Sequence, residues 1–134
     1  HDLFPCDSND FTLELLKSIK DVYGPNGPEK MLFNVFERKT AGLKAKAKGD
    51  TVADRAKWLA GVRDKEGFMS EYVSDNGTGS HILECHSPIL NLLEQFPIVG
   101  RLEQDLVAGV LGTEVRREET RTSGLYECTF YFQS

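Results

Sequence analysis

The chain has 134 residues, of which 40% are hydrophobic and 28% are charged, and its formal net charge is −5. This length and composition predict one soluble globular domain, spanning residues 1–134, with a core of its own. The acidic balance argues against autonomous nucleic-acid binding, because phosphate contacts need a basic surface. No apolar run approaches the ~20 residues of a membrane span, so we expect no contact with the membrane. The cysteines are expected to be reduced thiols, which predicts a cytoplasmic protein.

Apolar side chains recur at helical spacing through the first half of the chain, and this pattern predicts three helices. They are expected over residues 7–23, 28–48 and 51–66, and a glycine follows each one. Capping side chains open the first helix, Pro28 opens the second, and Thr51 opens the third. The apolar stripe of the third helix consists of Val52, Ala56, Leu59 and Val62.

From Phe68 the period changes from helical to two, which predicts a β-hairpin. Its strands are expected over residues 68–73 and 80–86, joined by turn residues between positions 75 and 79. Because successive side chains of a strand point to opposite faces, Cys85 and His86 should lie on opposite faces of the sheet.

A broken helix should follow this hairpin. Ser87 is expected to be its N-cap and Pro88 its first helical residue. Pro97 should break or kink the helical pattern, which then resumes and stops at Gly112.

The last two strands are expected over residues 113–119 and 125–132. Helices followed by hairpins, without regular βαβ alternation, predict an α+β domain. We expect N-terminal helices, then a mainly antiparallel four-stranded sheet into which the broken helix is inserted, with helices on one face.

Cys85, His86 and Cys128 form the best candidate constellation for chemistry. Neighbouring strands could bring the two cysteines together, and thiolate with imidazole suits zinc or an iron–sulfur cluster. Against a metal site, the adjacent Cys85 and His86 point to opposite faces, and buried structural thiols are the alternative. The same geometry argues against a Cys–His nucleophile, and no catalytic motif is present, so we expect no enzyme. Three cysteines without a CxxC pair are typical of free thiols.

Two aromatic residues extend the list of candidate ligand-binding residues. Trp58 lies beside the apolar stripe of the third helix, where it would line a ligand pocket or pack against the sheet. Tyr72 lies on the first strand. The candidates for ligand binding are therefore Trp58, Tyr72, Cys85 and Cys128.

Short motifs occur along nearly the whole chain in an order and spacing that resemble one family. They are Leu3-Phe4-Pro5, Glu66-Gly67-Phe68, Ser87-Pro88-Ile89, Phe96-Pro97, Leu111-Gly112 with Val115, and Gly124 with Cys128. Together they resemble the C-terminal region of predicted bacterial and archaeal transcriptional regulators. These regulators carry an N-terminal winged helix-turn-helix, and their better-known members repress genes of iron–sulfur-cluster biogenesis.

The resemblance implies an effector-sensing and dimerisation domain of a transcriptional regulator, without catalysis. DNA would be bound only through a winged-helix domain upstream of residue 1, which residues 1–134 do not include. The implied partners are a second copy of the chain and a small-molecule effector of unknown identity. The alternative is a stand-alone small-molecule-binding domain, since vinyl-4-reductase-like domains have a similar Gly-x-x-x-Cys ending. For the dimer we expect contact through two apolar stripes, Phe11-Leu15-Ile19 and Leu102-Leu106-Val110.

The chain departs from the cluster-binding members of this family at two positions. Those members have cysteines where this chain has Ser87 and Gly100, and only Cys128 is in register. Serine is a poor cluster ligand and glycine has no side chain. We therefore expect no cofactor, with an iron–sulfur cluster or zinc as the alternative that Cys85, His86 and Cys128 leave open.

Overall fold

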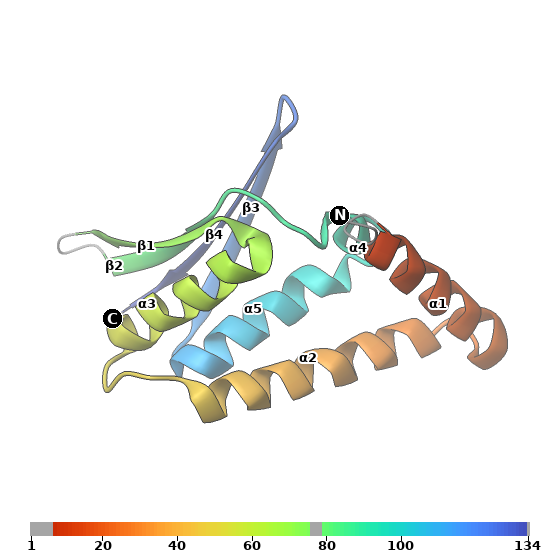
Figure 1. The fold of residues 1–134 in the computed structure, drawn as a ribbon, viewed down its shortest axis with the longest axis horizontal. Helices are drawn as coiled ribbons and strands as arrows, with labels where there is room; N and C mark the ends of the chain where they lie inside the picture. Colours follow the sequence, from red (N-terminus) through yellow and green to blue (C-terminus); the bar gives the residue numbers. More distant parts are fainter. Residues whose placement is uncertain (1–6, 76–78, 134) are drawn as a thin grey trace.

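A computed structural model of the chain describes residues 7–75 and 79–133. It confirms the predicted α+β class, with three helices before the first hairpin and a broken helix before the second (Figure 1). The elements are α1 (Asp7–Tyr23), α2 (Gly27–Lys46), α3 (Val52–Arg63), a π-helical turn η1 (Asp64–Phe68), β1 (Ser70–Asp75), β2 (Gly79–Glu84), α4 (Leu90–Gln95), α5 (Ile98–Leu111), β3 (Val115–Thr122) and β4 (Leu125–Phe132).

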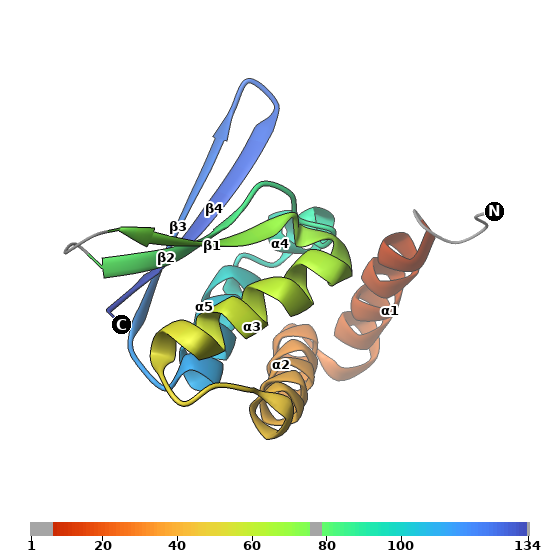
Figure 2. The ribbon, with the colours of Figure 1, turned by 60° about the vertical axis from the view of Figure 1, so that its left-hand side comes forward.

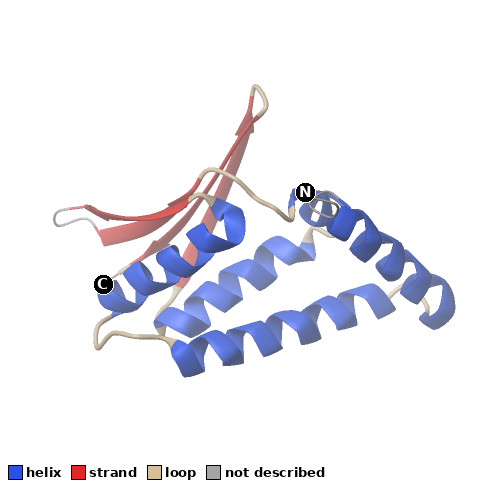
Figure 3. Ribbon diagram, in the orientation of Figure 1, coloured by secondary structure: helices blue, strands red, loops and turns tan. Residues whose placement is uncertain are grey.

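The strands form one antiparallel sheet in the order β1-β2-β4-β3. Figure 2 shows α3 and α5 against one face of this sheet, and in both ribbon views the β3–β4 hairpin extends beyond the helices. Colouring by secondary structure separates the helical layer from the sheet (Figure 3). In the central pair of strands Ser80 is opposite Phe132 and Glu84 is opposite Cys128, so these side chains share the face that the helices cover.

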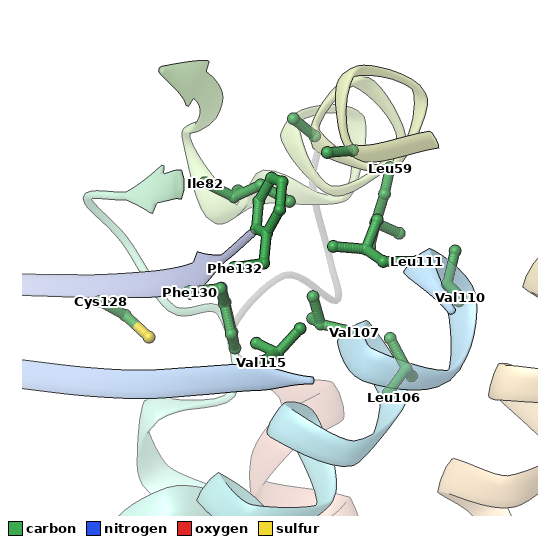
Figure 4. Close-up of a cluster of buried hydrophobic side chains, with 12 residues drawn as sticks. Leu59, Ile82, Leu106, Val107, Val110, Leu111, Val115, Cys128, Phe130 and Phe132 are labelled. Atoms are coloured by element: carbon green, nitrogen blue, oxygen red, sulfur yellow. The ribbon is translucent and has the colours of Figure 1, made fainter. Parts of the chain in front are cut away.

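The main core lies between this face and the helices α3 and α5. Phe130 and Ile82 from the sheet meet Leu59 of α3 and Leu111 of α5, and all four side chains are fully buried (Figure 4). A second cluster joins α1 and α2 to α4 and α5; its buried members are Leu16, Leu32, Leu93, Val99 and Leu102. The two clusters make one continuous helical layer, because α5 contributes to both.

One predicted surface is absent. The stripe of Leu102, Leu106 and Val110, expected to contact a second copy, is buried in the core of its own chain. The prediction was wrong because α5 is covered by the sheet on one side and by α2 on the other, which the sequence pattern of a single helix does not show. Phe11 and Leu15 of α1 remain exposed.

Local signals account for most helix boundaries. The Thr51 hydroxyl accepts a hydrogen bond of 3.1 Å from the Asp54 backbone N–H, which confirms the predicted start of α3. Gly67, predicted to end the third helix, instead lies within η1 with a φ of +102°, because α3 ends at Arg63 and the π-helical turn continues to Phe68. Pro97 divides the broken helix into α4 and α5 as predicted, and Gly112, with a φ of +76°, ends α5.

The start of α4 differs from the prediction. Ser87 is not an N-cap: α4 begins at Leu90, with Ile89 before it and no side-chain cap. Instead the Leu90 N–H donates to the Ser87 carbonyl at 3.2 Å. This closes a four-residue turn with Pro88 at its second position, which proline's fixed φ favours. The turn therefore uses the carbonyl of Ser87, and its hydroxyl does not cap the helix.

Two other differences concern the first hairpin. Phe68, predicted to start β1, belongs to η1, and β1 begins at Ser70. Its partner β2 ends at Glu84, so Cys85 and His86 follow the strand. The predicted turn falls largely on residues 76–78, which lie outside the described residues. None of the helices that the described residues form is long and apolar enough for a membrane crossing.

Candidate functional site

A guanidinium group is buried at the centre of the molecule. Arg63, the last residue of α3, is 4% exposed and meets two buried glutamates, Glu84 of β2 and Glu103 of α5. Its Nε and Nη2 donate to the two carboxylate oxygens of Glu84, the second at 2.9 Å, and Nη2 also donates to Glu103 at 2.8 Å. The Phe68 ring lies over the guanidinium, 3.8 Å from Cζ to the ring centroid. One cation therefore connects α3, β2, α5 and η1.

A second arginine extends this network toward the β3–β4 hairpin. Nη2 of Arg117 donates to Glu103 at 3.2 Å, to Glu119 at 2.8 Å and to the Tyr126 hydroxyl at 3.1 Å. Glu119 accepts a further bond of 2.7 Å from Arg121. Acids and bases thus alternate from the centre of the fold toward the turn of the β3–β4 hairpin, with Glu103 shared by two arginines.

This network was not predicted, although the sequence carries a signal for it. Arg63 follows Leu59 by four residues, so it continues the apolar stripe of α3. Glu103 occupies the buried face of α5, and Glu84 falls on the same face of β2 as the fully buried Ile82. Charged residues at positions that the period assigns to the core indicate buried ion pairs, because an unpaired charge there is very costly.

Burial and pairing shift the pKa values of these groups in different directions. Burial raises the pKa of Glu84 above its ordinary value, against the opposing influence of Arg63. Burial alone would lower the pKa of Arg63, but Glu84 and Glu103 raise it and keep the guanidinium charged. For Glu119, the hydrogen bonds and charges of Arg117 and Arg121 outweigh burial and lower the pKa. The network therefore holds one acid that ionises reluctantly and one that ionises readily.

The two described cysteines do not come together. Cys128 is fully buried on the helix-covered face, where burial raises the pKa of its thiol to about 12. Its cross-strand partner is Glu84, so Cys85 lies one residue past that pair and is exposed, as is His86. Cys6 lies outside the described residues. Within residues 7–75 and 79–133, no three His, Cys, Asp or Glu side chains are grouped as a metal ion requires.

The two aromatic candidates pack on the main core. Trp58 is half-buried against it, the second of the two arrangements expected for this side chain. The Tyr72 hydroxyl lies 3.2 Å from the Ser80 hydroxyl in a hydrogen bond, and its ring centroid is 6.3 Å from that of Phe132. Trp58 and Tyr72 therefore have structural contacts.

Gly100 and Ser87, the two positions at which the sequence motifs predicted a cysteine to be missing, have different surroundings. A Cβ added to Gly100 would lie 3.0 Å from Nη1 of Arg117, so the absence of a side chain admits the guanidinium. The same guanidinium acts on the pKa of Cys128, lowering it against the larger effect of burial. Arg117 thus lies beside Gly100 and acts on Cys128, whereas Ser87 contributes to the lining of a cavity.

This cavity, of about 930 Å³, lies between the α1–α2 pair and the segment that runs from the end of α3 to α4. Its walls are mainly apolar, with contributions from Leu16, Leu32, Phe36, Phe68, Leu90 and Leu106. Arg63 and Glu103 of the buried network reach its lining, and Lys39, Glu66 and His86 are exposed parts of it. His86 is thus the single metal candidate that lines the cavity; Trp58, Tyr72, Cys85 and Cys128 do not.

Ser87, a residue of the cavity lining, has a buried hydroxyl. Ser87 is 4% exposed, and its Oγ has no hydrogen-bond partner among the described residues. Buried polar groups are nearly always paired with protein, water or ligand. The cavity itself, large and mainly apolar with a few polar side chains in its lining, has the character of a small-molecule site.

Arg63→Met should lower the free energy of unfolding by about 3–5 kcal/mol at neutral pH, because it leaves two buried carboxylates without their shared cation. Arg116→Met is the control: this arginine is exposed on β3, pairs with the exposed Glu118 at 3.3 Å, and should change stability by less than about 1 kcal/mol. Urea unfolding measures both variants. If Arg63→Met and Arg116→Met lowered the free energy of unfolding equally, the buried network would stabilise the fold no more than an exposed ion pair does.

Glu84→Gln should improve stability relative to wild type as the pH rises. The raised pKa of Glu84 means that its protonated form is favoured in the fold. The stabilisation that this carboxyl group contributes is complete below its ordinary pKa of 4.5. It is lost as the pH rises through the pKa that Glu84 has in the folded protein. Glutamine cannot ionise, so the variant does not undergo this loss. When the free energy of unfolding is measured at a series of pH values, the variant should therefore gain stability relative to wild type as the pH rises toward neutral.

Glu119→Gln provides the opposite case. The lowered pKa of Glu119 gives stability above the ordinary value of 4.5, which is lost as the pH falls through the folded value. The variant should be less stable than wild type at neutral pH, and the two should converge in acid. For the two variants, the difference in unfolding free energy from wild type should change with pH in opposite directions. If it changed in the same direction for Glu84→Gln and Glu119→Gln, this account of the network would be contradicted.

Comparison of the chain with family models, with curated proteins and with solved structures found no match. The buried network and the cavity beside it are therefore the structural basis for a functional proposal.

Proposed function

We propose that the chain is the effector-sensing part of a bacterial or archaeal transcriptional regulator, and that its effector is a small molecule bound in the 930 Å³ cavity. The observation that carries the proposal is the cavity itself. Its walls come from the α1–α2 pair on one side and from η1, the β2–α4 segment and α5 on the other. A bound molecule would contact both sides at once.

Such a ligand would change the position of α1 relative to the rest of the molecule. Leu16 is the buried side chain through which α1 joins the second core cluster, while Phe11 and Leu15 are 62% and 48% exposed. Leu16 also lines the cavity. A ligand that binds one arrangement of α1 more tightly than another shifts the population toward that arrangement. In the proposed regulator this shift would be transmitted to a DNA-binding domain that precedes α1 in the chain.

We propose no catalytic role for the cavity. Of the acids that line it, Glu103 accepts hydrogen bonds from two arginines and Glu66 is exposed. The alternative function, a stand-alone small-molecule-binding domain, would use the same cavity without a DNA-binding partner. The gene sequence upstream of residue 1 distinguishes the two, because the regulator requires a winged helix there. A cytoplasmic location follows from action on DNA.

Val35→Trp should block the cavity. Val35 is a partly exposed residue of α2 in its wall, and a tryptophan there would fill space that a ligand needs. Nile red, an uncharged fluorescent probe of apolar sites, should bind the wild type saturably, and Val35→Trp should weaken binding about tenfold, or roughly 1.4 kcal/mol. Amide hydrogen exchange in α1 should slow when the probe binds.

Leu125→Trp is the control for this experiment. Leu125 is exposed on β4 and does not line the cavity, so a tryptophan there should leave Nile red affinity unchanged. Equal effects of the two substitutions, or none from Val35→Trp, would remove the cavity as the binding site. Unchanged hydrogen exchange in α1 would contradict the sensing mechanism even if the probe binds.

We also propose that the exposed side chains of α1 contact a second copy of the chain. Phe11, Leu15 and Val22 recur at helical spacing and are about half to three-quarters exposed. Leu15→Glu should convert a dimer at tens of micromolar to a monomer in sedimentation velocity, because a charge would be buried at the contact. Leu125→Glu, at a 75% exposed position on β4, should leave the dimer intact. A wild-type monomer at these concentrations would disprove the contact.

A further inference from the structure

The outer edge of β3 is a long strand edge that the fold leaves open. β3 is the last strand of the sheet, and among the described strands it pairs with β4 alone. Its residues follow one register without a bulge, and none of them is a proline. Proteins usually protect an edge strand with a bulge, a proline or a covering segment, because its free N–H and C=O groups pair readily with another strand.

One hydrogen bond shows which backbone groups of β3 point outward. The Arg117 N–H donates to the Gln104 side chain of α5 at 3.0 Å, away from β4. Hydrogen bonding alternates along an antiparallel pair, so the N–H and C=O groups of Glu119 and Arg121 point outward as well. The side chain from α5 covers the edge at Arg117, whereas the rest of the hairpin extends beyond the helices (Figure 2). The segment 118–122 is therefore an edge that a further strand can reach.

The side chains of this segment are complementary to themselves. When β3 pairs antiparallel with β3 of a second copy, a two-fold axis passes through one residue, which then lies opposite its own copy. An axis at Thr120 places Glu119 of each copy opposite Arg121 of the other. Opposite charges and paired threonines are favourable cross-strand neighbours, so this register is stabilised at each of these positions.

Registers centred on the neighbouring residues are unfavourable. An axis at Glu119 or at Arg121 places like charges directly opposite each other, which destabilises a strand pair. An axis at Glu118 does the same, and it also needs the Arg117 N–H, which is already bonded to α5. Of these registers, the alternation of charge along β3 thus permits the one centred on Thr120.

The ion pairs within one copy are compatible with this contact. Arg121 bonds to Glu119 of its own strand at 2.7 Å and to Glu94 of α4 at 3.3 Å. Arg121 and Glu94 are exposed, and a carboxylate can accept several hydrogen bonds. Each Glu119 therefore gains Arg121 of the other copy as a further neighbour.

We propose that β3 pairs antiparallel with β3 of a second copy about a two-fold axis at Thr120, which joins the two four-stranded sheets into one. The contact is separate from the one proposed for α1, since α1 and the hairpin lie apart in both ribbon views (Figures 1 and 2). It does not depend on the proposed function. Because it buries little apolar surface, the pairing is weak and needs a higher protein concentration than the α1 contact.

Leu15→Glu provides the background for the test, because it disrupts the α1 contact and leaves β3 unchanged. In sedimentation equilibrium this variant should associate at concentrations on the order of hundreds of micromolar, and added salt should weaken the association. The amide NMR resonances of Glu119 and Arg121 should shift with protein concentration, because their N–H groups become hydrogen-bonded. Those of β1, the other edge strand, should not shift.

Two charge reversals in the Leu15→Glu background test the register. Arg121→Glu and Glu119→Arg each replace two opposite-charge pairs with two like-charge pairs, so each should weaken self-association at least about fivefold. An equimolar mixture of the two variants should restore association, because the mixed pair has opposite charges at both positions. Glu118→Arg is the matched control: Glu118 lies opposite the neutral Thr122 in this register, so its reversal should weaken association less than about twofold.

The outcomes decide between this contact and others. No association at about 1 mM, a mixture that associates no better than its components, or an equal effect of Glu118→Arg would overturn the proposal. Concentration-dependent shifts in β1 instead of β3 would assign the association to the other edge and overturn it as well. If Glu119→Arg does not fold, Arg121→Pro decides, because it removes an outward N–H that β4 does not use. Arg121→Pro should abolish association while circular dichroism stays that of the folded protein, and association that survives it contradicts the proposal.

Discussion

The salt bridges of Arg63 are the interaction on which the arrangement of the other elements depends. The guanidinium at the end of α3 holds Glu84 of β2 and Glu103 of α5, and Glu103 in turn holds Arg117 of β3. A buried cation with two carboxylates tolerates little displacement, because a lost bond leaves a charge without water or partner. Hydrophobic packing brings α3, α5 and the sheet together, and the network fixes which residues meet. Phe68, stacked on Arg63, extends this constraint to η1.

The same residues connect the rigid centre of the molecule with the cavity. Arg63 and Glu103 belong both to the network and to the cavity lining, whereas the opposite wall comes from α1 and α2. One wall is therefore anchored by ion pairs and the other by the smaller second core cluster. A ligand between an anchored wall and a lightly held one would act mainly on the lightly held wall. In the proposed sensor, this asymmetry would make the position of α1 the output of ligand binding.

Gly100 and Ser87, two positions that the sequence motifs singled out, acquire their surroundings from the fold. Gly100 admits the Arg117 guanidinium at close range, because an added Cβ would lie 3.0 Å from its Nη1 atom. The charge of the same guanidinium acts on the pKa of the buried Cys128 thiol. Ser87 closes the turn before α4 and contributes to the lining of the cavity.

The sequence by itself determined the α+β class, the helical stripes, the division of the broken helix at Pro97 and the start of α3 at Thr51, because periodicity, proline and capping act over a few residues. It did not determine that Ser87 closes a turn, since that depends on the path from β2 to α4. Nor did it predict that Arg63 meets Glu84 and Glu103, residues 21 and 40 positions away. Those contacts, and the cavity beside them, exist only after the helices pack on the sheet, because they join side chains whose proximity no local pattern records.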